Sequence, residues 1–150
     1  MEKPNYKLLA RQLDALLKGE TDLIANLSNA SALLNDQLDN INWLGFYLIK
    51  GNELILGPFQ GKPACVHIPI GKGVCGTAVA KAEIQRVADV NAFPGHIACD
   101  ANSQSEIVLP IYQNNTIIGV LDIDAPITNR FSKDDEEGLK EVVTVLEKHL

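Results

Sequence analysis

The feature that most constrains the fold is a pair of strand–turn–strand segments in the middle of the chain. Residues 42–49 and 53–56 alternate in side-chain character and are separated by a short turn that contains Gly and Asn. Residues 107–112 and 116–123 repeat this arrangement around another turn with two asparagines. A further strand is predicted over residues 65–70. Short turns join antiparallel neighbours, so the pattern predicts a central antiparallel sheet.

Helical periodicity marks both ends of the chain. Gly19 is predicted to end a first helix, and Thr21 can cap a second one. Near the C-terminus, Ser132-Lys133-Asp134-Asp135 forms a capping box that opens a closing helix. The inward side of the first helix is predicted to carry Leu8, Leu9, Leu13, Leu16 and Leu17. This order predicts one α+β domain over residues 1–150, with the terminal helices on one sheet face and a loop-covered pocket on the other.

Charge and cysteine content exclude several classes of function. The 150 residues carry a net charge of −6 without any basic run, which disfavours binding to nucleic acids or anionic membranes. The N-terminus has no apolar segment typical of a secretory signal, and no apolar run is long enough to span a bilayer. Three cysteines without an export signal indicate thiols in a reducing compartment. We therefore expect a cytoplasmic protein.

Strand alternation places two groups of side chains away from the aliphatic core. Trp43 and Tyr47 flank Gly45 on one face of their strand, opposite the aliphatic side chains. Asp122 and Asp124 share one face of a later strand. Two carboxylates this close repel on a dry face, so they are expected to line water or to hold a cation or an ammonium group. The alternatives are a plainly solvated acidic face and an aromatic face that only packs under a helix.

The segment Gly71-Lys72-Gly73-Val74-Cys75-Gly76 matches the glycine pattern of dinucleotide-binding sites, with Asp89 further on. We reject that interpretation because the predicted helix from Val74 to Ala82 is short. The chain also lacks the repeating strand–helix units of a doubly wound sheet. The glycines are instead expected to let a strand turn sharply into a short helix.

The loop over residues 91–106 is the candidate site of chemistry. It consists of small and polar residues, with Cys99 in its middle and Glu106 at its exit. A cysteine in such a loop can be solvated and can ionise, unlike one in an apolar run. The alternative is that Cys99 is only a small hydrophobic residue in a loop.

Together with the motifs given below, these residues resemble those of GAF domains and, among them, of the free methionine-(R)-sulfoxide reductases. The resemblance covers nearly the whole chain and includes all three cysteines. The matching motifs are Asn42-Trp43-Leu44-Gly45-Phe46-Tyr47, Gly71-Lys72-Gly73-Val74-Cys75-Gly76-Thr77-Ala78, Asp89-Val90, His96-Ile97-Ala98-Cys99-Asp100, Ser105-Glu106-Ile107-Val108-Pro110 and Gly119-Val120-Leu121-Asp122-Ile123-Asp124-Ala125-Pro126. It implies reduction of a methyl sulfoxide without a metal or an organic cofactor.

The resemblance also implies roles for the cysteines. Cys99 is expected to attack the sulfoxide sulfur as a thiolate and to become a sulfenic acid. Cys65 is implied as the principal resolving residue, which forms a disulfide, and Cys75 as a second one. An external dithiol such as thioredoxin would then reset the enzyme. Glu106 is the candidate general acid, provided that burial keeps it protonated.

Substrate contacts follow from the chemistry of free methionine sulfoxide, which is a zwitterion. Its ammonium group suits Asp122 and Asp124, its methyl group suits the Trp43 and Tyr47 face, and its carboxylate suits loop N–H groups. An acidic cage for the ammonium would exclude methionine within a peptide. A homodimer is left open as the assembly.

Two other classes of function are left open. A GAF sensor would bind a small ligand without turnover, which an assay with methionine sulfoxide distinguishes. A zinc site could draw on Cys65, His67, Cys75, His96 and Cys99, although their spacing matches no short paired-ligand motif.

Overall fold

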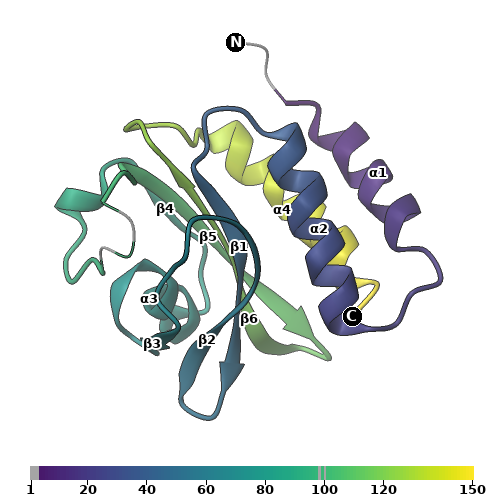
Figure 1. Ribbon diagram of the computed structural model, residues 1–150, viewed down its shortest axis with the longest axis horizontal. Coiled ribbons are helices and arrows are strands. Elements are labelled where there is room, and N and C mark those ends of the chain that lie inside the picture. The colour runs from purple at the N-terminus through teal and green to yellow at the C-terminus, as the bar shows by residue number, and fades with distance from the viewer. Residues whose placement is uncertain (1–3, 98, 100) are drawn as a thin grey trace.

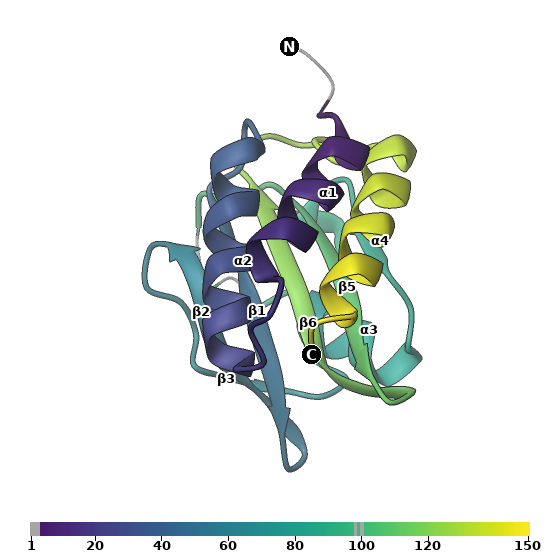
Figure 2. The ribbon, with the colours of Figure 1, turned by 90° about the vertical axis from the view of Figure 1, so that its right-hand side faces the viewer.

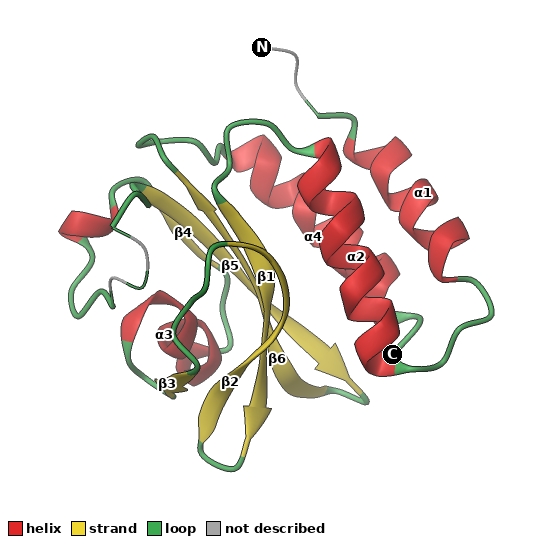
Figure 3. Ribbon diagram, viewed as in Figure 1, coloured by secondary structure: helices red, strands yellow, loops and turns green. Residues whose placement is uncertain are grey.

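The chain forms one antiparallel sheet with helices on both sides. The computed structural model describes residues 4–97, 99 and 101–150. Within these residues, four α-helices accompany six strands in the order β3-β2-β1-β6-β5-β4 (Figures 1 and 3). The elements are α1 Tyr6–Leu17, α2 Leu23–Gln37, β1 Trp43–Lys50, β2 Glu53–Gly61, β3 His67–Pro69, α3 Gly73–Lys81, β4 Gln85–Val87, the 3₁₀ turn Val90–Ala92, β5 Ser105–Gln113, β6 Thr116–Ala125 and α4 Lys133–Glu147. The predicted α+β architecture is confirmed.

The terminal helices cover one face of the sheet, as predicted. Helices α2 and α4 contact the strands, and α1 packs against α4 and α2 (Figure 2). Alternate strand residues such as Leu44, Phe46, Leu121 and Ile123 point into this larger core. The capping box at Ser132 is present at the start of α4.

Two details of the helix prediction were wrong. Leu8 and Leu16 are 43% and 46% exposed, because the buried stripe of α1 runs through Leu9, Leu13 and Leu17. The side chain of Asp22, not that of Thr21, caps α2 by accepting a hydrogen bond from the Ala25 N–H group.

The opposite face of the sheet builds a smaller, second core. Trp43, Tyr47, Val108 and Val120 point to this side and pack with residues of α3. The predicted assignment of side chains to the two faces of β1 and β6 is therefore confirmed. Figure 1 shows α3, β3 and the loop that follows β4 on this side, away from the terminal helices.

The strand boundaries differ from the prediction at several strands. β5 begins two residues earlier than predicted, at Ser105, and β6 ends two residues later, at Ala125. β2 extends to Gly61, five residues beyond its predicted end. β3 begins at His67, so Cys65 lies in the preceding loop and not at a strand start. The edge strand β4 was not predicted, because three residues are too few for an alternation pattern.

The glycine-rich motif before α3 serves close packing. A Cβ atom at Gly76 would lie 2.4 Å from the Pro69 carbonyl oxygen, so a side chain has no room there. The backbone N–H of Gly71 also donates a hydrogen bond to the Gly76 carbonyl oxygen at 2.8 Å. The motif thus folds the chain sharply from β3 into α3, as expected. No helix in the described part of the chain is long and apolar enough to cross a membrane.

Candidate functional site

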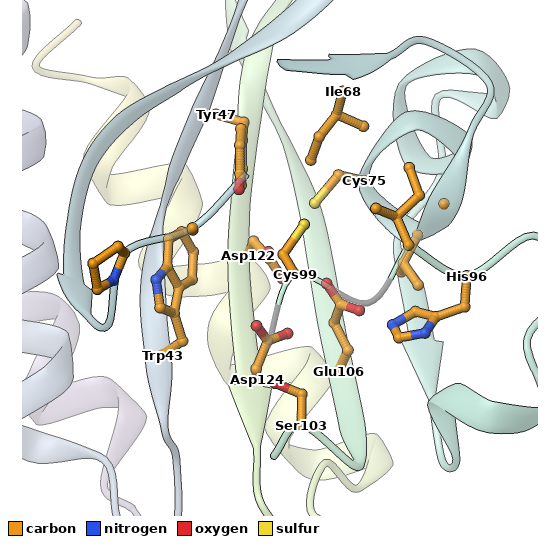
Figure 4. Close-up of a pocket in the computed structure, with 15 residues that line it drawn as sticks. Trp43, Tyr47, Ile68, Cys75, His96, Cys99, Ser103, Glu106, Asp122 and Asp124 are labelled. Atoms are coloured by element: carbon orange, nitrogen blue, oxygen red, sulfur yellow. The ribbon is translucent and has the colours of Figure 1, made fainter. Parts of the chain in front are cut away.

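Strand register aligns the predicted site residues across three neighbouring strands. Glu106 on β5 pairs with Asp124 on β6, and Asp124 pairs with Trp43 on β1. Asp122 lies two residues before Asp124 on β6 and pairs with Gly45 on β1. Because these residues share one face, their side chains converge on the side of the sheet that carries α3 (Figure 4).

A pocket with a cavity of about 40 Å³ lies between this face, α3 and the loop that carries Cys99. Seven of the eight predicted site residues line it, and the eighth, Cys65, is bonded to Cys99. The seven are Trp43, Tyr47, Cys75, Cys99, Glu106, Asp122 and Asp124. Figure 4 shows the three carboxyl groups directed toward a common space near the two lining cysteines. The structure therefore assembles residues that are far apart in the sequence.

The aromatic side of the pocket is a stack of three rings. The Trp43 ring lies 5.9 Å from that of Tyr47 and 5.2 Å from that of Phe59, both in stacked orientation. Its Nε1 donates a hydrogen bond to the Lys62 carbonyl oxygen at 3.1 Å. A Cβ atom at Gly45 would lie only 2.3 Å from the Phe59 Cβ, so the glycine makes room for the stack. These contacts fix an apolar wall beside the acidic groups.

The acidic groups are enclosed, which excludes the plainly solvated face. Glu106 is 7% exposed and Asp122 is 5% exposed, and Asp124 is half-buried. Burial raises the pKa of Glu106 well above its usual value of 4.5, and the nearby charges of Asp122 and Asp124 add to the effect. Burial also raises the pKa of Asp122, against hydrogen bonds that lower it. Glu106 and Asp122 therefore keep their protons to a higher pH than isolated carboxyl groups do.

The three cysteines occupy different environments. Cys65 and Cys99 form a disulfide with a Cα–Cα distance of 5.5 Å, although 34 positions separate them in the sequence. Cys75, on α3, keeps a free and buried thiol. Burial, followed by the charges of Asp122, Glu106 and Asp124, raises the pKa of this thiol. In this disulfide form, Cys75 is thus a protonated thiol beside the acidic groups.

The Tyr47 hydroxyl links the sheet to the segment that carries Cys65. It donates a hydrogen bond to the Cys65 carbonyl oxygen at 2.9 Å. Burial raises the pKa of Tyr47, with the charge of Asp122 as the next contribution, so the hydroxyl stays a donor. The sequence placed Tyr47 on the aromatic wall but gave no sign of this second contact.

Two polar lining residues, Ser103 and His96, were not predicted to take part in catalysis or substrate binding. The Asn42 side-chain amide donates a hydrogen bond to the hydroxyl of Ser103, which is buried in the pocket wall. His96 lies on the Cys99 loop, and burial lowers its pKa despite the charge of Asp122. Their position in the same polar loop as Cys99 was the available signal.

The alternative zinc site, built from Cys65, His67, Cys75, His96 and Cys99, is not assembled in the structure. Cys65 and Cys99 are consumed by their disulfide, and His67 is exposed and contacts Glu53 at 3.0 Å. Over residues 4–97, 99 and 101–150, the group with metal-binding geometry is a different one, which consists of Cys75, Glu106 and Asp122.

The sequence matches the GAF domain family over residues 12–150. It is 58% identical to the free methionine-R-sulfoxide reductase of Escherichia coli (strain K12), an alignment that covers 97% of this chain and 88% of that protein.

Two solved structures of fRMsr from Staphylococcus aureus are also similar. The reduced form is 64% identical with a TM-score of 0.97, covering 99% of this chain and 97% of that one. The complex with substrate is 63% identical with a TM-score of 0.96, covering 100% and 98%.

Proposed function

The chain belongs to the GAF-domain family and, within it, to the free methionine-R-sulfoxide reductases, and from this membership we propose that it reduces free L-methionine-(R)-sulfoxide to methionine. The observation that carries the proposal is one pocket in which Cys99 meets three enclosed carboxyl groups and an aromatic wall. A thiol, a proton source and an apolar surface are the groups that reduction of a methyl sulfoxide needs.

Cys99 is the nucleophile in this proposal. Its thiolate attacks the sulfoxide and takes over the oxygen: the S–O bond of the substrate breaks, an S–O bond to the Cys99 sulfur forms, and one proton is taken up. Methionine leaves as the reduced product, and Cys99 is oxidised to a sulfenic acid. A free thiol with a pKa of about 8.5 is only partly ionised at neutral pH, so hydrogen-bond donors must stabilise the thiolate. Cys99 is half-buried in a loop, where backbone N–H groups can supply such donors.

Glu106 donates the proton that the sulfoxide oxygen requires. An acid is useful only if it still holds its proton at the working pH. Burial and the neighbouring carboxyl groups raise the pKa of Glu106, which supports this role. The side chain lines the same pocket as Cys99, so both groups can reach one substrate.

Cys65 resolves the sulfenic acid. Its thiol attacks the Cys99 sulfur, water leaves, and a disulfide forms. The Cys65–Cys99 disulfide supports this step, because the two residues are close enough to bond. Cys75 serves as the second resolving thiol, from the wall of the same pocket. Thioredoxin, a cytoplasmic dithiol, then returns the disulfide to two thiols by exchange.

The pocket selects the free amino acid by its charges. Asp122 and Asp124 take the substrate ammonium group, and the wall of Trp43 and Tyr47 takes its methyl group. A peptide-bound methionine sulfoxide has no α-ammonium group, so it leaves the buried carboxyl groups without their partner. That loss should exclude peptide substrates.

Turnover of the purified protein with dithiothreitol tests the proposal. We expect methionine from free L-methionine-(R)-sulfoxide, with little from the S epimer or from N-acetylated sulfoxide. Binding of the R epimer without any turnover would identify a sensor and not an enzyme. Comparable rates on the N-acetylated compound would refute the proposed recognition of the ammonium group.

A further inference from the structure

Glu106 lies close to the end of its strand. It is the second residue of β5, which directly follows the loop that carries Cys99. In the ladder between β5 and β6, the single pair of Ser105 with Ala125 precedes it. The ends of strands fray, because few hydrogen bonds hold them. A carboxyl group that must stay enclosed and aimed at a substrate therefore needs a further restraint at this point.

Ser105 supplies a restraint from the other face of the sheet. Because side chains alternate along a strand, Glu106 points into the pocket (Figure 4) while Ser105 points toward the terminal helices. Ser105 is fully buried. Its hydroxyl donates a hydrogen bond to the Ile127 carbonyl oxygen at 2.6 Å and accepts one from the backbone N–H of Arg130 at 3.3 Å. The hydroxyl thus ties the start of β5 to the segment that joins β6 to α4.

That segment is itself fixed by the side chain of Arg130, which is 8% exposed. The Nε of Arg130 donates a hydrogen bond to the Asp39 carbonyl oxygen at 2.9 Å, and its Nη1 donates one to Asp135 Oδ2 at 3.3 Å. Asp135 also accepts a hydrogen bond from the Tyr6 hydroxyl at 2.6 Å. A buried charge is costly without such partners, and here they come from α1, α4 and the loop before β1. The start of β5 is therefore anchored to the layer of terminal helices.

We propose that Ser105 is a positioning residue for the reaction, which holds the Glu106 carboxyl in the pocket through this anchor. The inference rests on the proposed function, in which Glu106 is the general acid and Cys99 alternates between the substrate and Cys65. The Cys99 loop shifts between these two partners, and it joins β5 at Ser105. An acid must stay within hydrogen-bond reach of the oxygen that it protonates. An anchored Ser105 lets the loop move while Glu106 stays in place.

The titration of Glu106 tests the anchor without any turnover. In the disulfide form, ¹³C NMR follows the side-chain carboxyl carbon of Glu106, which is identified by its absence in Glu106→Gln. Loss of the hydroxyl in Ser105→Ala frees the start of the strand and lets water reach the carboxyl group, so the pKa of Glu106 should fall toward its ordinary value of 4.5. The substitution changes none of the titratable groups around Glu106, which are Asp122 and Asp124 on β6, Cys75 on α3, Tyr47 on β1 and His96 on the Cys99 loop.

Ser31→Ala is the matched control. Ser31 is also fully buried, and its hydroxyl also donates a hydrogen bond to a backbone carbonyl, that of Ser28 at 2.8 Å. It lies on α2, which packs on β1 and β2, so its loss should leave the pKa of Glu106 unchanged. An equal fall of this pKa in Ser31→Ala and Ser105→Ala would show a general loosening of the fold and overturn the proposal.

Arg130→Lys tests the far end of the anchor. Lysine keeps the charge but cannot reproduce the forked geometry of the two guanidinium hydrogen bonds. The pKa of Glu106 should therefore fall in this variant as well, by less than in Ser105→Ala. Circular dichroism identifies the variants that fold. An unchanged pKa of Glu106 in the folded variants of Ser105 and Arg130 would overturn the proposal.

The effect on the reaction is measured separately, as the rate at which the reduced enzyme releases methionine in one turnover. In Ser105→Ala we expect release to be roughly 10-fold slower at saturating substrate, since a small misplacement of a catalytic group can cost up to about 100-fold. The substrate concentration for half-maximal rate should not change. Release at the parent rate would contradict the positioning role. A parent protein that releases no methionine would refute the proposed function, while the NMR titration would still decide whether Ser105 anchors Glu106.

Discussion

At the residue scale, the site depends on a carboxyl group that keeps its proton. Glu106 is 7% exposed, and Asp122 and Asp124 lie on the neighbouring strand. Burial is the main cause of its raised pKa, followed by the like charges of the two aspartates. The same enclosure that would destabilise an ionised carboxylate therefore keeps a proton on Glu106, as the proposed general-acid role requires.

Replacement of Glu106 by glutamine tests that role in catalysis. Glu106→Gln keeps the shape of the side chain but removes the transferable proton, so turnover should fall by roughly 10²- to 10⁴-fold. The measurement is kcat with free L-methionine-(R)-sulfoxide, with circular dichroism to confirm the fold. Near-normal kcat would remove the general-acid assignment.

The same residue makes stability depend on pH. In the unfolded chain Glu106 loses its proton above its usual pKa of 4.5, whereas the folded chain holds the proton to a higher pH. Between the two pKa values the unfolded state binds fewer protons, so the free energy of unfolding decreases as the pH rises.

In Glu106→Gln this decrease should be smaller, although not absent, because the pKa of Asp122 is raised as well. Urea denaturation at a series of pH values from 5 to 8 measures it, with the exposed Glu83→Gln as the control. An unchanged pH dependence in Glu106→Gln would show that Glu106 ionises normally in the fold.

At the element scale, the register of three strands builds the site. The pairs Glu106 with Asp124 and Asp124 with Trp43 place an acid, a second acid and an aromatic ring in one row across β5, β6 and β1. The disulfide and the Tyr47 hydroxyl then hold the two loops over this row. Small errors in these positions would separate the thiols from the carboxyl groups.

Gly45 has no side chain, which allows β1 and β2 to approach closely beneath the aromatic wall. In Gly45→Ala the added Cβ would overlap the Phe59 Cβ, at 2.3 Å, so we expect a loss of about 1–3 kcal/mol in the free energy of unfolding. Urea denaturation measures this loss, and the exposed Thr116→Ala is the control. A variant as stable as the parent would mean that β2 shifts freely, and the wall would not be rigid.

Tyr47 connects β1 to the loop that carries Cys65, the proposed resolving cysteine. Tyr47→Phe removes the hydrogen bond to the Cys65 carbonyl, so we expect a loss of about 1 kcal/mol in stability and slower formation of the disulfide. Release of methionine in the first turnover should be unaffected. The exposed Tyr112→Phe is the control, and quenched alkylation followed by mass spectrometry measures the rate of disulfide formation. Disulfide formation at the parent rate in Tyr47→Phe would exclude this positioning role.

The sequence predicted the faces of the strands well but not their alignment. Alternation along β1 and β6 was enough to place Trp43 and Tyr47 on the same side as Asp122, because side-chain direction is a local property. Register depends on pairing between distant segments, and the depth of burial of Asp122 depends on α3 and the Cys99 loop. Neither is contained in a local pattern, so the solvated acidic face remained an alternative. The start of β3 was misplaced because Cys65 continues the alternation without pairing to another strand.

At the scale of the whole molecule, the larger apolar core and the pocket lie on opposite faces of the sheet. The larger core lies between the sheet and the terminal helices, whereas the smaller core on the other face contains the pocket. The titratable groups of the pocket thus lie on the side that does not hold the helical bundle. This division lets enclosed acids and cysteines occupy one face while apolar packing on the other stabilises the fold.

For the molecule as a whole, we propose that attack and recycling belong to different cysteines. Attack requires one thiolate, and recycling requires a second thiol that can reach the sulfenic acid. Cys65 and Cys99 are bonded in the structure and Cys75 is not, which supports a pair with distinct roles. Cys75→Ser should therefore have a milder effect than either of the other two substitutions.

Methionine released per enzyme molecule in the absence of reductant tests this claim most directly. The reduced parent and Cys65→Ser should each release about one equivalent, since a single thiolate suffices for attack. With thioredoxin, Cys65→Ser should then stall, or turn over more slowly through Cys75. Cys99→Ser should release none. Mass spectrometry of the products should find the oxidised sulfur on Cys99. A full equivalent of methionine from Cys99→Ser would contradict the account, because another residue would then be the nucleophile.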